Sequence, residues 1–168
     1  MLLVALVFSL NLLPAKAEVR HNQEISKFSA SIISCHDGDT CNADVKGRTV
    51  KIRLAGIDAP EIEQSEGLEA KKFLESKILK KTVEFDCKGK SYDRIVCFIS
   101  LDGLDINEEM VRSGFAFDYQ KFSGGKYKTL METAQRKKIG IWKTLLKSPF
   151  CTRHPNSKSC IVNALFNQ

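Results

Sequence analysis

The feature that most constrains the fold is a series of short segments in which polar and apolar side chains alternate. In residues 48–55 (RTVKIRLA), Val50, Ile52 and Leu54 alternate with polar neighbours. A period of two is typical of a half-buried strand with one face toward a core. Arg53 is therefore predicted on the opposite face, pointing away from the core.

Seven further segments complete a predicted order of strands and helices. Additional strands are expected at 28–35, 40–45, 82–87 and 95–101, with residues 88–90 opening the connection between the last two. Helices are expected at 67–79 and at 127–139. A short helix between them is expected to begin at a capping box formed by Asp105 and Glu108 and to end at Gly114. This order favours an OB-fold, a five-stranded Greek-key barrel with three α-helices. An α+β open sheet is the alternative.

The N-terminus has the pattern of an export signal. Residues 1–13 are mostly apolar, and Pro14 and the small-residue pattern Ala15-Lys16-Ala17 follow. The run is shorter than the roughly 20 apolar residues of a membrane-spanning helix. We therefore expect a signal peptide over 1–17 and a periplasmic or secreted protein, with no stable membrane association after cleavage.

The rest of the chain is long enough for one domain with its own core. We expect a lead-in at 18–27, a folded domain at 28–146, and a C-terminal tail at 147–168, in a monomeric protein. The net charge of +6, to which residues 1–17 contribute one lysine, suits a polyanionic partner such as nucleic acid. Solubility alone is the alternative reading of this charge.

Six cysteines are consistent with an oxidising compartment. They fall into three local couples, which predicts the disulfides Cys35–Cys41, Cys87–Cys97 and Cys151–Cys160. Fifteen pairings are formally possible for six cysteines. A zinc cluster is disfavoured, because the sequence has no CxxC motif and its three histidines are scattered.

Several charged residues lie where strands or turns end. Asp39 and Asp58 each have a neighbouring glycine and would suit a hard cation such as Ca²⁺ or Mg²⁺, which prefers oxygen ligands. Taken alone, each aspartate fits an ordinary turn equally well. Arg53, five residues before Asp58, and Arg94 on another strand each offer a bidentate fork to a phosphate. Tyr92 could stack on a base or pack across a strand.

The ordered set resembles the staphylococcal nuclease (thermonuclease) family. The motifs are 37–40 (DGDT), 53–61 (RLAGIDAPE) and 92–94 (YDR), with 67–70 (GLEA), 106–107 (IN) and 140–142 (GIW). The resemblance runs from about Ile32 to Trp142. Each motif alone is weak, whereas the ordered set is specific.

The resemblance implies a role for each site residue. Asp39 and Asp58 match carboxylate ligands of calcium, and Ala59 stands where the family supplies a backbone carbonyl to the metal. Glu61 matches the glutamate described as the general base toward water. Arg53 and Arg94 match the two arginines that bind the scissile phosphate, and Tyr92 matches a tyrosine that contacts the nucleotide.

Two residues depart from the best-known member of the family. Asp93 replaces a glycine and Ser91 replaces a lysine. Because Asp93 adds a negative charge beside Arg94, we expect reduced substrate affinity without loss of the site.

The resemblance implies a calcium-dependent nuclease, and the signal pattern adds export. Recognition through phosphate and stacking predicts little sequence specificity, with DNA as substrate and RNA as a second candidate. By the resemblance, the products would carry 3′-phosphate and 5′-hydroxyl ends. The alternative is a catalytically silent domain of the same fold that binds oligonucleotides or protein partners.

Overall fold

Five strands of the main sheet form a barrel. The computed structural model describes residues 26–144 and 148–157. The five are β1 (Ser26–Cys35), β2 (Thr40–Val45), β3 (Arg48–Leu54), β5 (Thr82–Ser91) and β6 (Arg94–Leu101). Neighbouring strands run antiparallel in the order β3-β2-β1-β5-β6. All five predicted strands are present, and β1 and β5 are longer than predicted.

The sheet closes because its two end strands also pair. β3 and β6 run parallel, with Ile52 opposite Ile95, Arg53 opposite Val96 and Leu54 opposite Cys97. Closure removes the free edges that an open sheet would leave unpaired. The predicted five-stranded barrel of the OB type is therefore confirmed, and the open-sheet alternative is wrong.

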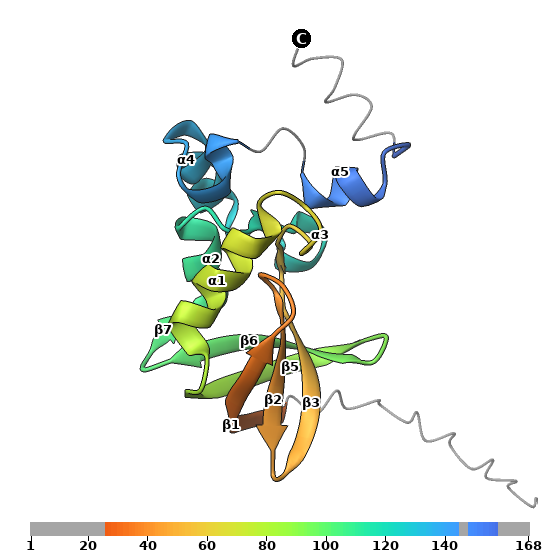
Figure 1. Ribbon diagram of the computed structural model, residues 1–168, viewed down its shortest axis with the longest axis vertical. Coiled ribbons are helices and arrows are strands. Elements are labelled where there is room, and N and C mark those ends of the chain that lie inside the picture. The colour runs from red at the N-terminus through yellow and green to blue at the C-terminus, as the bar shows by residue number, and fades with distance from the viewer. Residues whose placement is uncertain (1–25, 145–147, 158–168) are drawn as a thin grey trace, which may run out of the picture.

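The three predicted helices cover one end of the barrel. They are α1 (Gly67–Ile78), α2 (Ile106–Arg112) and α4 (Lys128–Arg136), and Figure 1 shows them together above the strands. Two short helices, α3 (Gln120–Ser123) and α5 (Pro149–Arg153), were not predicted. In the described parts of the chain, no helix is long and apolar enough to cross a membrane.

Short elements connect the barrel to the helices. β4 (Ile57–Asp58) pairs with β8 (Phe117–Asp118), and β7 (Leu104–Asp105) extends the sheet next to β6. A single 3₁₀ turn, η1 (Gly140–Lys143), follows α4. These pieces span two to four residues, too few for a hydrophobic period to be read from sequence.

The core lies between the barrel strands and the helices. Ile32, Ile52 and Phe85 of the strands are buried together with Leu74 of α1 and Met110 of α2. Burying a large apolar side chain contributes roughly 1.5–3 kcal/mol. This shared core fixes the barrel end against α1, where the candidate site is built.

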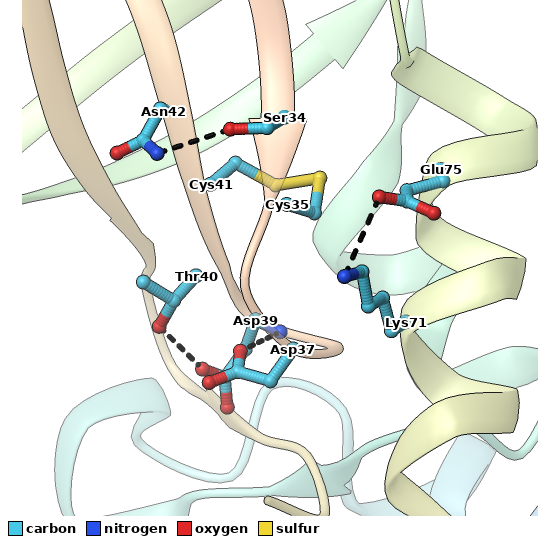
Figure 2. The surroundings of a disulfide bond; sticks show 9 residues. All are labelled: Ser34, Cys35, Asp37, Asp39, Thr40, Cys41, Asn42, Lys71 and Glu75. Atoms are coloured by element: carbon cyan, nitrogen blue, oxygen red, sulfur yellow. Dashed lines mark hydrogen bonds and ion pairs between the residues drawn. A yellow bond between two sulfur atoms is a disulfide. The ribbon is translucent and has the colours of Figure 1, made fainter. Parts of the chain in front are cut away.

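Two of the predicted disulfides are present. Cys35–Cys41 joins β1 to β2, and Cys87–Cys97 joins β5 to β6. In each pair the two cysteines lie directly opposite one another across the ladder. Figure 2 shows Cys35–Cys41 beside the turn that carries Asp37 and Asp39. The third predicted pair includes Cys160, which lies outside the described residues.

Two details of the predicted elements were wrong. Residues 88–90 do not open a connection, because β5 continues through a bulge next to Gly89 as far as Ser91. Asp105 does cap α2 by accepting from the Glu108 backbone N–H at 2.9 Å. The Glu108 carboxylate, however, pairs with Arg112 and does not accept the Asp105 backbone N–H as a capping box would require.

Candidate active site

The turn between β1 and β2 places two aspartates inside the molecule. Asp37 and Asp39 are each only 5% exposed, and the Asp39 backbone N–H donates to Asp37 Oδ1 at 2.9 Å. A Cβ on Gly38 would lie 2.7 Å from the Cβ atoms of both Ala59 and Ala70. Glycine is therefore required here, because the turn packs directly on the neighbouring loop and on α1.

Asp39 is held by neighbours on both sides. Its Oδ2 accepts the Ala59 backbone N–H at 2.7 Å, and its Oδ1 accepts the Thr40 hydroxyl at 3.0 Å. Thr40 begins β2 and pairs with Arg53 of β3. This pairing brings the Asp39 carboxylate next to the Arg53 guanidinium.

Arg53 joins the two predicted metal-ligand carboxylates. Its Nη1 lies 2.7 Å from Asp39 Oδ2, and its Nη2 lies 3.3 Å from Asp58 Oδ1. The alternation of β3 turns Arg53 away from the core as predicted, yet its side chain is only 14% exposed. The two aspartates cover it, so residues from the β1–β2 turn, from β3 and from β4 form one buried charged cluster.

Burial and a neighbouring negative charge disfavour the ionised forms of two aspartates in the cluster. Burial, followed by the charge of Asp39, raises the pKa of Asp37 from 3.8 to about 7. Burial and the charge of Asp39 also raise the pKa of Asp58, although Arg153 and Arg53 oppose the shift. An added cation would relieve both effects, so the cluster is electrostatically suited to a metal ion.

Glu61 lies at the edge of this cluster, on the loop between β4 and α1. Its backbone N–H donates to Gln64 Oε1 at 3.0 Å, and its carbonyl accepts the Gln64 N–H at 2.9 Å. Gly67, the first residue of α1, packs so closely that a Cβ there would lie 1.8 Å from the Glu61 carbonyl oxygen. The start of α1 therefore fixes the backbone of Glu61 while the side chain stays 39% exposed.

Arg94 occupies the same outer face as Arg53. Arg53 pairs with Val96 across the parallel β3–β6 ladder, and Arg94 lies two residues before Val96 on the same strand. Because side chains two residues apart in a strand share a face, both guanidinium groups project from one side of the sheet. Among the described residues, Arg94 makes no ion pair.

The hairpin tip between β5 and β6 differs from what the sequence suggested. Tyr92 is 95% exposed at a φ of 58°, which rules out packing across a strand. Asp93, expected to disturb Arg94, instead pairs with Lys51 Nζ of β3 at 2.6 Å. A hydrogen bond from Lys51 lowers the pKa of Asp93. The extra negative charge therefore has a partner other than Arg94.

Arg153 was not identified from the sequence, and the structure places it in the site. It ends α5, and its guanidinium contacts both Asp58 and Glu61. No motif marks Arg153, because it lies in the tail beyond the family-like region. A tertiary contact across 92 or more residues leaves no local pattern to read.

The donor set available to a metal is small. No group of three or more His, Cys, Asp or Glu side chains poised for a metal occurs in the described ranges. Asp39 and Asp58 supply two buried carboxylates, and Ala59, 2% exposed, adjoins both. Two carboxylates and a backbone carbonyl would leave positions for water and substrate on a hard cation. The residues thus fit such an ion, while the ligand roles of these three residues stay predictions.

Comparison with known proteins supports a nuclease function for this chain. A family model described as staphylococcal nuclease homologue matches residues 51–144. An "Uncharacterized endonuclease" of Haemophilus influenzae is 38% identical, covering 69% of this chain and 67% of the relative. An "Uncharacterized endonuclease" of Escherichia coli is 31% identical over 66% of this chain and 74% of its own.

A fungal relative is also similar, over a smaller share of its length. "Probable endonuclease LCL3" of Podospora anserina is 32% identical, covering 72% of this chain but 51% of the relative. The family match spans more than half of the chain and includes Arg53, Asp58, Glu61 and Arg94. This chain belongs to the staphylococcal nuclease homologue family.

Proposed function

We propose that this protein is an exported, calcium-dependent nuclease that hydrolyses phosphodiester bonds in DNA, and in RNA as a second substrate. The observation that carries the proposal is the contact of one arginine, Arg53, with both Asp39 and Asp58. Glu61 reaches the same cluster through Arg153. The residues proposed to bind a cation, to bind phosphate and to act as the base thus lie close together.

Each residue has a task in the proposed reaction. Glu61 orients or deprotonates a water molecule, since its side chain is partly open to solvent. Arg53 and Arg94, on one face of the sheet, hold the scissile phosphate and balance its developing charge. Bound calcium would supply further charge stabilisation at the phosphate.

The proposed cleavage has defined products. The oxygen of water bonds to phosphorus while the bond from phosphorus to the 5′ oxygen breaks, and that oxygen takes up a proton. The products carry a 3′-phosphate and a 5′-hydroxyl. Binding through phosphate and through stacking on the exposed Tyr92 would give little sequence specificity.

Export to a periplasm or to the medium is part of the proposal. Residues 1–17 lie outside the described residues, so support comes from the two disulfides, which form stably in oxidising compartments. N-terminal sequencing of the protein from fractionated cells should find a chain beginning after Ala17. A chain recovered from the cytosol with residues 1–17 intact would contradict export. Gel filtration tests the expectation of a monomer.

The nuclease proposal is tested by measuring acid-soluble nucleotides released from DNA and from RNA, with calcium and with a chelator. We expect Glu61→Gln and Arg53→Ala each to lower turnover by at least about a hundredfold while the protein stays folded. Arg136→Ala is the matched control, because this exposed arginine of α4 lies outside the cluster. Circular dichroism reports whether each variant is folded.

The possible outcomes separate the alternatives. Turnover unchanged in Glu61→Gln would remove the role of general base from that residue. Activity that survives the chelator would exclude a required calcium ion. Binding of oligonucleotides without any cleavage would favour the catalytically silent domain. End-labelling of the products shows whether the phosphate stays on the 3′ side.

A further inference from the structure

The C-terminal tail returns to the candidate active site. Helix α5 begins with Ser148 as its cap and is anchored by Phe150, whose ring centroid lies 6.5 Å from that of Tyr119. Tyr119 immediately precedes α3, and Figure 1 shows α5 beside α3 above the barrel. The tail is therefore packed against the part of the domain that borders the carboxylate cluster.

Arg153 at the end of α5 engages the oxygens that a cation would need. Its Nη2 lies 2.6 Å from Asp58 Oδ1 and 2.7 Å from Asp58 Oδ2, while its Nη1 lies 2.5 Å from Glu61 Oε1. Both oxygens of one predicted metal ligand are thereby engaged. The same guanidinium also holds the carboxylate predicted to activate water.

We propose that Arg153 is an internal competitor of calcium, so that the tail sets the calcium concentration at which the nuclease becomes active. The inference rests on the proposed function, because it takes Asp58 as a calcium ligand. Calcium and the guanidinium are both cations, and each needs the Asp58 oxygens at contact distance. Arg153 spans both Asp58 oxygens, and a calcium ion there would bring a second cation against the same carboxylate. We therefore expect calcium binding to displace Arg153.

The charges around the cluster explain why a cationic side chain occupies the proposed calcium site when calcium is absent. Asp39, Asp58 and Glu61 present three carboxylates, of which Arg53 contacts the first two and Arg153 the last two. A buried carboxylate without a partner is costly. Arg153 supplies the closer cationic partner of Asp58, at 2.6 Å against 3.3 Å for Arg53, when calcium is absent, and yields its place when calcium is abundant.

Linkage gives the expected size of the effect. If calcium binding displaces Arg153, the contact between Arg153 and Asp58 weakens calcium binding by some factor. Removing Arg153 must then strengthen calcium binding by that same factor. Coupling between sites typically amounts to about 5- to 150-fold in affinity. We therefore expect Arg153→Ala to lower the calcium Kd of the protein by at least about fivefold.

The experiment is calorimetric titration of calcium into the metal-free mature protein. Arg153→Ala should bind more tightly than wild type, and Arg153→Lys should lie between the two, because lysine keeps the charge but loses the fork. Arg136→Ala is the control for loss of an exposed arginine and should match wild type. Phe150→Ala, which loosens α5 without touching the carboxylates, should shift the Kd in the same direction by a smaller factor.

Hydrogen exchange supplies a second readout that does not depend on activity. The amides of Thr152 and His154 bond to carbonyls of Ser148 and Phe150 within α5. Calcium should speed their exchange in wild type, because α5 loses its anchor at Asp58. In Arg153→Ala these amides should exchange fast with or without calcium.

The outcomes distinguish this inference from the function on which it rests. A calcium Kd that is the same in wild type, Arg153→Ala and Phe150→Ala would overturn the competition while leaving the calcium-dependent nuclease intact. Weaker calcium binding in Arg153→Ala would also overturn it, since Arg153 would then support the bound state. Absence of calcium binding in every variant would overturn both proposals.

Discussion

Two hairpins of the barrel each carry a disulfide between their paired strands, but the turn of one is buried and the turn of the other is exposed. In the β1–β2 hairpin, the turn beyond Cys35–Cys41 buries Asp37 and Asp39, and its Gly38 packs against Ala70 of α1. In the β5–β6 hairpin, the tip beyond Cys87–Cys97 is open and exposes Tyr92 almost fully. The first hairpin thus fixes charged groups in place, and the second leaves an aromatic ring exposed to solvent.

The largest expected effect concerns the buried turn. Asp39→Asn should lower turnover at least about a hundredfold, because it removes a charge from the predicted calcium site while keeping an oxygen for the Ala59 N–H. Turnover on DNA at saturating calcium measures this. Full turnover with ordinary calcium dependence would show that the buried turn is not the metal site.

The disulfides offer a direct test of the comparison between hairpins. Removing either pair by double substitution to alanine should cost about 2–3 kcal/mol of unfolding free energy, since the closed loops span 6 and 10 residues. Only loss of Cys35–Cys41 should also weaken calcium binding, because that bridge adjoins the Asp39 turn. Urea unfolding and calorimetry separate the two effects. Equal losses of calcium affinity in both variants would refute the division of roles.

The raised pKa of Asp37 predicts a dependence on pH. Since its pKa is about 7 in the folded protein against an ordinary 3.8, the cost of its charge is absent below pH 3.8, grows as pH rises, and is complete above about pH 7. Asp37→Asn should therefore leave the metal-free protein unchanged below pH 3.8 and stabilise it by on the order of 4 kcal/mol at pH 8. Denaturant titrations across this range, in chelator, measure the difference. A gain independent of pH would contradict the assignment.

The smallest expected effect concerns the open hairpin. Tyr92→Ala should leave the unfolding free energy within about 0.5 kcal/mol of wild type, because the ring is exposed. Binding of single-stranded DNA should weaken by about tenfold, in keeping with the loss of one stacked base. Tyr92→Phe is the control that keeps the ring. Destabilisation in Tyr92→Ala without loss of affinity would reverse the comparison.

Long periodic segments were predictable, and short ones were not. The strand at Thr40–Val45 and the start of α1 at Gly67 match the expectation, because alternation and helical spacing extend over several residues there. The bulge next to Gly89 was missed, since β5 resumes pairing after a residue that reads as a turn. Helix α5 was missed because five residues carry no resolvable period.

The candidate site was likewise predictable in part. The sequence alone determined the residue types and their order, because the strand period, the turn glycines and the charged motifs are local properties of the chain. Only the tertiary structure decided that β3 meets β6, that Asp93 pairs with Lys51, and that Arg153 lies on Asp58 and Glu61. These contacts join segments that are far apart in the chain. Such contacts depend on how the barrel closes and on where the tail packs, and neither leaves a pattern in neighbouring residues.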